Sequence, residues 1–401
     1  MKPIRLMTPA ATSLHGCPID KFVRRNVTRS ILDFATGAPA TAAPTQFRIE
    51  AAKAVLTEHQ GYADSAGLLE LRSALASKLA RIGFEVDMER EIAITVGATG
   101  GLHAAFQSVV GHNDEVLVPV PAFPVFDLIR LAGAMPVPIM LEGPSWELSL
   151  ESLRRAVTHR TRAIYLNQPG NPTGRVFTPA EIDAVVTICH ERDLTVVEDV
   201  VYDEIYFSKP ARVTGAAPGM KDRVIRVGSF SKTYAVPGWR LGFVAATGVL
   251  GERVRRVVET TTGGAVAQLQ SAIVPAALNS AVDFVALRSK YQDCRNLLAR
   301  VLEGAGFRAS VPEGGIFIYA ECPPGLSVPE LCARGIAAMP GSVFYPNEEH
   351  VTYARFCFAR PVEQIHALES LLSHSCPIRA SSSFDGFPIS AIPAKHLDKE
   401  F

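Results

Sequence analysis

One lysine of this sequence has the surroundings of a nucleophile rather than of an ordinary surface charge. Lys232 ends the sequence SFSK, which begins at Ser229, and Arg240 follows eight residues later in PGWRLG. Small and apolar neighbours can exclude water from an ε-amine and lower its pKa enough for the amine to attack a carbonyl group. The segment therefore predicts a lysine that forms an imine. The alternatives are a solvated surface lysine and, for Arg240, a surface ion pair.

Polar groups follow two of the predicted strands. Asn171 stands in NQPGNPTG after the strand 162–167, and the proline after it favours an extended backbone that can aim the amide above the sheet edge. Alone, this motif predicts only a turn. Asp199 comes directly after the buried strand 194–198, where a carboxylate is costly unless it has a partner. Asp203 offers a second acid, but we prefer Asp199 because it directly ends the apolar strand.

Two further features are suited to anions. The sequence GATGG at 97–101 predicts a small-residue turn that opens a helix, and backbone N–H groups at a helix N-terminus form a cradle for phosphate. Arg355 lies in the predicted strand 352–358, on the face opposite Phe356 and Phe358. A guanidinium offers two parallel donors, which predicts a carboxylate as its ligand.

In this order and spacing, the motifs resemble the class I and II aminotransferases, which use pyridoxal 5'-phosphate (PLP) and have the fold called type I. The resemblance covers about residues 31–372. The stretches 93–106 and 339–359 are most similar to the kynurenine, glutamine and methionine aminotransferase branch, which accepts apolar and aromatic amino acids. The N-terminal segment matches that branch poorly.

The resemblance implies a role for each residue around the cofactor ring. Lys232 is expected to hold PLP as a Schiff base and to move a proton between the substrate Cα and the cofactor C4'. Asp199 is expected to keep the pyridine nitrogen protonated, so that the ring accepts electrons from Cα. Tyr202 and Asn171 are expected to hydrogen-bond the phenolic oxygen. The chain departs from the usual D-E-x-Y pattern here, with Val200 in place of the glutamate.

The same resemblance assigns residues to the phosphate, the ring and the substrate. The expected phosphate ligands are Ala98, Thr99, Gly100, Ser229, Ser231 and Arg240. Tyr62 is expected to reach the phosphate of a second subunit, which implies a homodimer with composite active sites; capping of the following helix is the alternative. Phe123 is expected to stack on the ring. Arg355, with Asn171 and the backbone at Gly37, is expected to bind the substrate α-carboxylate.

The predicted elements place these residues at one edge of a sheet. Strands alternate with helices from about residue 91 to 245, which predicts an α/β fold: a mostly parallel sheet between two helix layers, with function at the carboxyl ends of the strands. A long helical region from about 266 to 303 leads to a smaller α+β domain. The expected parts are an N-terminal segment (1–45, irregular apart from a short strand at 31–34, and part of the small domain), a large PLP-binding domain (46–290), a small C-terminal domain (291–373) and a weakly structured tail (374–401).

Composition narrows the possible classes of protein. The formal net charge of zero, with 48% hydrophobic and 20% charged residues, is typical of a globular protein and gives no reason to expect a nucleic-acid or anionic-membrane partner. The seven cysteines form neither a C-x-x-C pair nor a zinc-site spacing, so we expect reduced thiols and no metal. We found no secretory signal or membrane-spanning run and expect a cytoplasmic protein.

The function that these features favour is transamination, in which an α-amino acid donates its amine and a 2-oxo acid receives it. Because PLP stabilises a Cα carbanion in many reactions, a β-lyase, a cyclase or another specialised biosynthetic enzyme remains open. A non-catalytic amino-acid sensor is disfavoured, since every catalytic position is present and no DNA-binding segment is recognisable.

Overall fold

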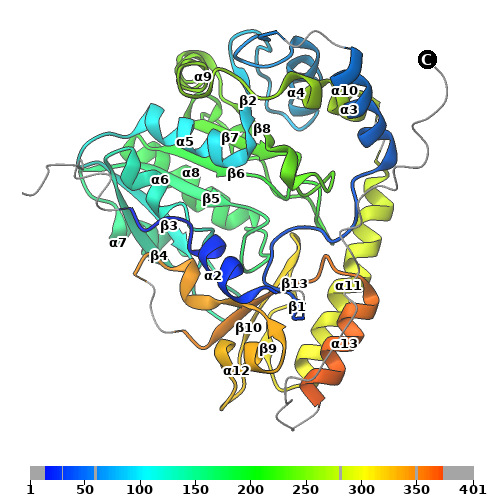
Figure 1. The fold of residues 1–401 in the computed structure, drawn as a ribbon. Coiled ribbons are helices and arrows are strands. Elements are labelled where there is room, and N and C mark those ends of the chain that lie inside the picture. Colours follow the sequence, from blue (N-terminus) through cyan, green and yellow to red (C-terminus); the bar gives the residue numbers. More distant parts are fainter. Residues whose placement is uncertain (1–13, 29, 58–60, 280–281, 348–350, 374–401) are drawn as a thin grey trace, which may run out of the picture.

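The computed structural model of the protein describes residues 14–28, 30–57, 61–279, 282–347 and 351–373. The expected tail at 374–401 lies outside the described residues. Buried apolar side chains form two clusters, one around a large central sheet and one around a smaller sheet. Figure 1 shows two helices, α11 (Phe284–Gly304) and α13 (Val362–Ser373), side by side next to the smaller sheet.

The central sheet has seven strands in the order β2-β8-β7-β6-β5-β3-β4. The strands are β2 (Ile92–Val96), β3 (Glu115–Val120), β4 (Met135–Met140), β5 (Thr161–Asn167), β6 (Thr195–Asp199), β7 (Val224–Ser229) and β8 (Leu241–Ala245). β8 runs antiparallel to both of its neighbours, and the pairs from β7 to β4 are parallel. The expectation of a mostly parallel α/β sheet is confirmed.

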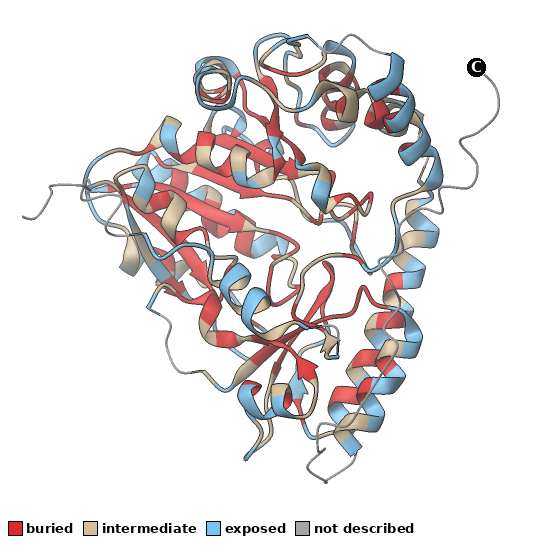
Figure 2. Ribbon diagram, viewed as in Figure 1, coloured by how far each residue is buried: buried red, intermediate tan, exposed pale blue. Residues whose placement is uncertain are grey.

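Helices cover this sheet, and its inner strands are buried over most of their length (Figure 2). They include α5 (Gly97–Val109), α6 (Phe126–Leu131), α7 (Leu150–Ala156), α8 (Pro179–Arg192) and α9 (Gly248–Thr262). The start of α8 follows from its sequence: Thr178 and Glu181 form a reciprocal capping box, and Pro179 occupies the first turn, where its missing N–H costs nothing. α3 (Thr45–Thr57) and α4 (Leu69–Arg81) pack against α10 (Ala267–Asn279) beside the sheet.

The smaller sheet is antiparallel, in the order β12-β13-β10-β9. Its elements are β9 (Arg308–Ala309), β10 (Phe317–Glu321), β12 (Met339–Pro340), β13 (Tyr353–Cys357), α11 (Phe284–Gly304), α12 (Val328–Ala333) and α13 (Val362–Ser373). β1 (Leu32–Asp33) pairs in parallel with β11 (Ile336–Ala337), which ties the N-terminal segment to this part of the fold. The pairing favours our assignment of that segment to the small domain; the domain boundaries themselves remain a proposal.

One local expectation was wrong. Residues 18–26 are not irregular but form α2 (Pro18–Asn26), with proline and an acid in its first turn, basic residues in its last turn, and Phe22 packed against both apolar clusters. The expected helical region 266–303 consists of two helices, α10 and α11. Asp283 caps α11 by accepting hydrogen bonds from Val285 and Ala286.

Candidate active site

The order of the central sheet brings the predicted polar residues to one edge. β5, β6 and β7 are parallel neighbours, so their carboxyl ends lie side by side, and Asn167 at the end of β5 is in register with Asp199 at the end of β6. Ser229 ends β7, and Lys232 lies in the turn that follows. β8 returns beside β7, with Gly242 in register with Ser229.

Asp199 is a buried acid with hydrogen-bond donors but no cation. Its side chain is 3% exposed. The Tyr165 hydroxyl donates to Oδ2 over 2.8 Å, and the Val201 N–H donates to Oδ1 over 3.2 Å. Burial raises the pKa of this carboxyl to about 6, against the lowering effect of the two hydrogen bonds. No ion pair within the described ranges includes Asp199, so the carboxylate is free to bind a cationic ligand.

Lys232 contacts the N-terminal segment through its amine. Its Nζ donates to the Gly37 carbonyl over 2.5 Å, across 195 positions of sequence. The pKa of this half-buried lysine is lowered to about 8, first by burial and then by the positive charges of Arg355, Arg240 and Arg360. A substantial fraction of the amine is therefore neutral and nucleophilic near neutral pH.

Arg355 is a buried guanidinium that pairs with no carboxylate among the described residues. It is 1% exposed, and it donates to Asn171 Oδ1 over 2.9 Å and to the Ala35 carbonyl over 2.5 Å. Its Nε has no hydrogen-bond partner in the described part of the chain. The guanidinium carbon lies 3.9 Å from the ring centre of Phe317 and 5.2 Å from that of Phe344. Burial lowers the pKa of Arg355 to about 10, and a carboxylate ligand would offset that cost.

Gly37 lies between these charged groups. Its carbonyl accepts from Lys232, and a Cβ added at this position would lie 3.0 Å from Phe317 Cζ and 3.7 Å from Arg355 Nη2. A larger residue would therefore crowd both the aromatic ring and the guanidinium.

The predicted phosphate cradle is formed by the first turn of α5 and Arg240. Val96 stands at the N-cap of α5, and its side chain cannot accept a hydrogen bond from the first turn. The N–H groups of Ala98, Thr99 and Gly100 in that turn therefore have no side-chain cap. The Arg240 guanidinium lies against Gly97, where a Cβ would come within 2.5 Å of Nη2 and where φ is +66°. The Arg240 guanidinium has no acid partner among the described ion pairs, so these N–H groups and the guanidinium are suited to bind an anion.

Two predicted phosphate ligands lie close to Lys232 in the sequence: Ser229 ends β7, and Ser231 directly precedes the lysine. Ser229 Oγ donates to the Leu241 carbonyl over 3.3 Å and accepts from the Ser231 N–H over 3.1 Å. Ser231 is buried. These bonds fix the turn between β7 and Lys232. The two serines and the lysine are therefore held by the same short segment.

The other predicted residues, Tyr202, Phe123 and Tyr62, differ in how closely the structure ties them to the buried polar residues described above. Tyr202 is buried, its ring packs edge-on against Phe317 at 5.9 Å, and burial raises the pKa of its hydroxyl. Phe123 is half-buried in the turn after β3, and the described hydrogen bonds and ring contacts do not join it to Lys232 or Asp199. Tyr62 is fully exposed and is not part of the cluster in its own chain.

Two residues of the site were missed in the sequence. Tyr165 was hidden in the apolar run of β5, although a lone phenol in an aliphatic strand was a signal. Arg360 holds the N-terminal segment: its guanidinium donates to the carbonyls of Asp33, Thr36 and Ala38 over 2.5–2.6 Å. Because these partners lie more than 300 positions away, the sequence around Arg360 carried no sign of its role.

The residues present fit PLP. The site offers an amine of lowered pKa for the aldehyde, an uncapped helix start with an arginine for the phosphate, and a buried acid without a cation for the pyridine nitrogen. Elsewhere in the described ranges, no group of three or more His, Cys, Asp or Glu residues is placed to hold a metal ion. None of the described helices combines the length and the apolar character needed to span a bilayer.

Comparisons with known proteins agree with this geometry. Residues 29–370 match the family described as aminotransferase class I and II. The chain is 27% identical to human kynurenine–oxoglutarate transaminase 1, over 88% of this chain and 94% of that protein. It is 30% identical to an aspartate aminotransferase of Pyrococcus abyssi, over 84% and 89%. A structure from Escherichia coli whose title reports a methionine aminotransferase function superimposes with a TM-score of 0.81 at 26% identity, over 88% and 96%. The chain therefore belongs to the class I and II aminotransferase family.

Proposed function

We propose that this aminotransferase binds PLP through Lys232 and transfers the amino group of an apolar or aromatic α-amino acid to a 2-oxo acid. The observation that carries the proposal is Asp199, a buried acid with no cation among the described residues, on the same sheet edge as an amine of lowered pKa. The structural alternative, a satisfied core carboxylate, is disfavoured because neutral donors alone leave a buried charge uncompensated.

The residues divide the chemistry among them. When bound, PLP supplies an electron-accepting ring that stabilises negative charge at the substrate Cα. Asp199 holds the proton on the pyridine nitrogen, and Tyr202 and Asn171 donate to the phenolic oxygen. Ser229, Ser231, Arg240 and the first turn of α5 bind the phosphate. With PLP bound, the Lys232 amine would hold and move the proton between the substrate Cα and the cofactor C4', since its lowered pKa suits a base near neutral pH.

The substrate binds through its α-carboxylate. Arg355 and Asn171 bind that group beside the Gly37 backbone, as the absence of an ion pair to Arg355 among the described residues supports. Phe317 and Phe344 are buried against the guanidinium and help to hold it in place. Phe123 stacks on the cofactor ring from the turn after β3.

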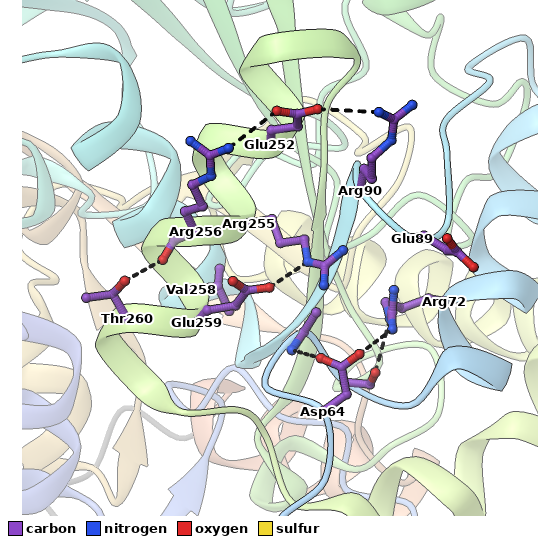
Figure 3. A network of polar contacts seen from close by, with 12 residues as sticks. Asp64, Arg72, Glu89, Arg90, Glu252, Arg255, Arg256, Val258, Glu259 and Thr260 are labelled. Atoms are coloured by element: carbon purple, nitrogen blue, oxygen red, sulfur yellow. Dashed lines mark hydrogen bonds and ion pairs between the residues drawn. The ribbon is translucent and has the colours of Figure 1, made fainter.

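A second copy of the chain completes each site. Tyr62 is fully exposed, and the exposed apolar residues Val55, Leu56 and Val266 are carried by or adjoin α3 and α10, which pack together. The stretch after Tyr62 is anchored: Arg72 donates to Asp64 Oδ2 over 2.7 Å (Figure 3) and to the Gly67 carbonyl over 3.0 Å. A fully exposed tyrosine next to this anchored stretch supports a contact with the partner's phosphate in a homodimer.

The cytoplasm remains our proposed location. The six cysteines in the described part of the chain are all free, as expected for a reducing compartment.

A product screen tests the proposed reaction. Purified enzyme with PLP is incubated with each common amino acid and a mixture of 2-oxo acids, and products are measured by mass spectrometry. We expect 2-oxo acids from aromatic and apolar donors, with matching amino acids formed from the acceptors. Release of ammonia and pyruvate from cysteine conjugates without amine transfer would instead identify a β-lyase.

A further inference from the structure

Tyr165 is the one tyrosine of β5, and its hydroxyl is directed at the key acid of the site. The phenol is 1% exposed and donates to Asp199 Oδ2 over 2.8 Å. Tyr165 is in register with Val197, and Asn167 is in register with Asp199, so all four side chains project from one face of the sheet. Tyr165 lies two residues before the end of β5, and its hydroxyl reaches along the sheet to Asp199 at the end of β6.

The rest of β5 shows how unusual this group is. Ala163, Ile164 and Leu166 are fully buried apolar residues, and another aliphatic side chain at 165 would fill the strand without a polar atom to satisfy. Burying a phenol is costly unless its hydroxyl finds a partner. The partner here is Asp199, an acid with no cation in the described part of the chain. The tyrosine therefore serves the acid, and not the reverse.

The two oxygens of Asp199 each accept one donor. Val201 N–H fixes Oδ1 from the turn after β6, and the Tyr165 hydroxyl fixes Oδ2 from β5. Two donors from two elements hold the carboxylate plane in one orientation. The titratable groups that face Asp199 are Tyr165 from β5 and Tyr202 from the following turn, and both bring neutral hydroxyls rather than a positive charge.

We propose that Tyr165 is a positioning residue for the cofactor, which orients the Asp199 carboxylate and keeps it ionised so that it can hold a proton on the pyridine nitrogen. This inference rests on the proposed function, because it assumes that Asp199 faces that nitrogen. It adds a specific role for Tyr165, which acts through Asp199 and has no part in binding the substrate.

The test uses Tyr165→Phe, with Tyr291→Phe as a matched control. Tyr291 is a buried tyrosine of α11 whose hydroxyl bonds to Thr41, away from Asp199. In the apoenzyme, the pKa of Asp199 is measured by carboxyl ¹³C NMR and assigned with Asp199→Asn. Losing one hydrogen bond to the charged form should raise that pKa by about one unit in Tyr165→Phe. The control should leave it unchanged.

The holoenzyme provides the second measurement. With PLP labelled with ¹⁵N in the ring, the nitrogen shift reports directly whether the pyridine nitrogen carries a proton. Tyr165→Phe should lower the protonated fraction at a given pH, whereas Tyr291→Phe should not. An unchanged Asp199 pKa in the apoenzyme, or an unchanged ring nitrogen with PLP still on Lys232, would overturn the inference.

Failure of the underlying function gives a different result. If wild-type enzyme does not take up PLP at Lys232, the proposed function fails and this inference fails with it, before any variant is compared. If Tyr165→Phe does not fold, the ¹³Cζ resonance of Tyr165 in the wild-type apoenzyme serves instead. It should titrate with the Asp199 pKa and lose that titration in Asp199→Asn; a flat titration would overturn the inference.

Discussion

Two adjacent acids of β6 differ in the partners that the fold gives them. Glu198, fully buried on one face, has a complete set: Arg226 Nη1 at 2.5 Å, the Thr214 hydroxyl at 2.8 Å, and N–H donors from Thr214 and Gln168. Asp199, on the other face, has two neutral donors and no cation in the described part of the chain. A buried carboxylate normally has a cationic partner or becomes neutral. The first acid holds the fold together, and the second is free to bind a ligand.

Two arginines in and after β13 also differ in their partners. Arg360 donates to backbone carbonyls of the N-terminal segment, which it holds in place. Arg355, five residues earlier, donates to Asn171 and to the Ala35 carbonyl, and no ion pair among the described residues includes it.

The largest expected effect comes from replacing each of the two acids of β6 by its amide. Asp199→Asn should lower kcat/KM by about a thousandfold or more, roughly 4 kcal/mol, because the ring loses its charged partner. Glu198→Gln should instead lower the free energy of unfolding by about 3–5 kcal/mol, because it leaves Arg226 buried and unpaired. Steady-state kinetics and urea unfolding measure the two effects.

Asp203→Asn is the control for the Asp199→Asn substitution. Asp203 lies 3.6 Å from Lys78 on the neighbouring helix α4, so its loss should change activity little. A damaging Asp203→Asn together with a mild Asp199→Asn would reverse our choice of acid.

Arg355→Ala should raise KM for every amino-acid substrate, by about a hundredfold, while PLP remains bound. The lost contacts are charge-assisted hydrogen bonds to the carboxylate that all substrates share, so the effect should not depend on the side chain. KM values for aromatic, apolar and acidic donors measure it, and absorbance measures bound PLP. A variant that loses PLP would show that Arg355 is structural or binds phosphate.

The third prediction concerns the apoenzyme and pH. Burial raises the folded-state pKa of Asp199 to about 6, above the value of about 4 in an unfolded chain. The stability that this group contributes is therefore present below pH 4 and is lost as pH rises through 6. The difference in unfolding free energy between wild type and Asp199→Asn should fall by about 3 kcal/mol from pH 4 to 7. Added PLP should remove this dependence, and its persistence in the holoenzyme would argue against a pyridinium partner.

Much of the sheet was predictable from the sequence, and the reason is local. β5 and β6 lie within one residue of the predicted strands 162–167 and 194–198, because a continuous apolar run acts over a few residues. α2 was missed because its charged residues hide a narrow apolar stripe that finds its partners only in the folded chain.

Site residues that stand in a recognisable motif were predictable from the sequence. Site residues whose role depends on a distant partner were not. Asn171, Asp199, Lys232 and Arg355 stand in recognisable segments. Tyr165 and Arg360 depend on partners far away in sequence, so only the fold brings out their roles.

Tyr62→Phe carries the smallest expected effect, an increase of about tenfold in the Kd for PLP, since one hydrogen bond to the phosphate is lost. A hybrid dimer of Tyr62→Phe with Lys232→Ala subunits locates that bond. If Tyr62 acts on the partner's site, the one remaining Lys232 lies beside an intact tyrosine and binds PLP with wild-type affinity. Tenfold weaker binding in the hybrid would place Tyr62 in its own subunit's site.

The most direct test of the account is chemical attachment of the cofactor. Holoenzyme is reduced with borohydride and digested, and the modified peptide is sequenced by mass spectrometry. The account predicts the phosphopyridoxyl group on Lys232, with Lys232→Ala losing the covalent label. A label on any other lysine, or none on the wild-type protein, would contradict the assignment of this sheet edge as a PLP site.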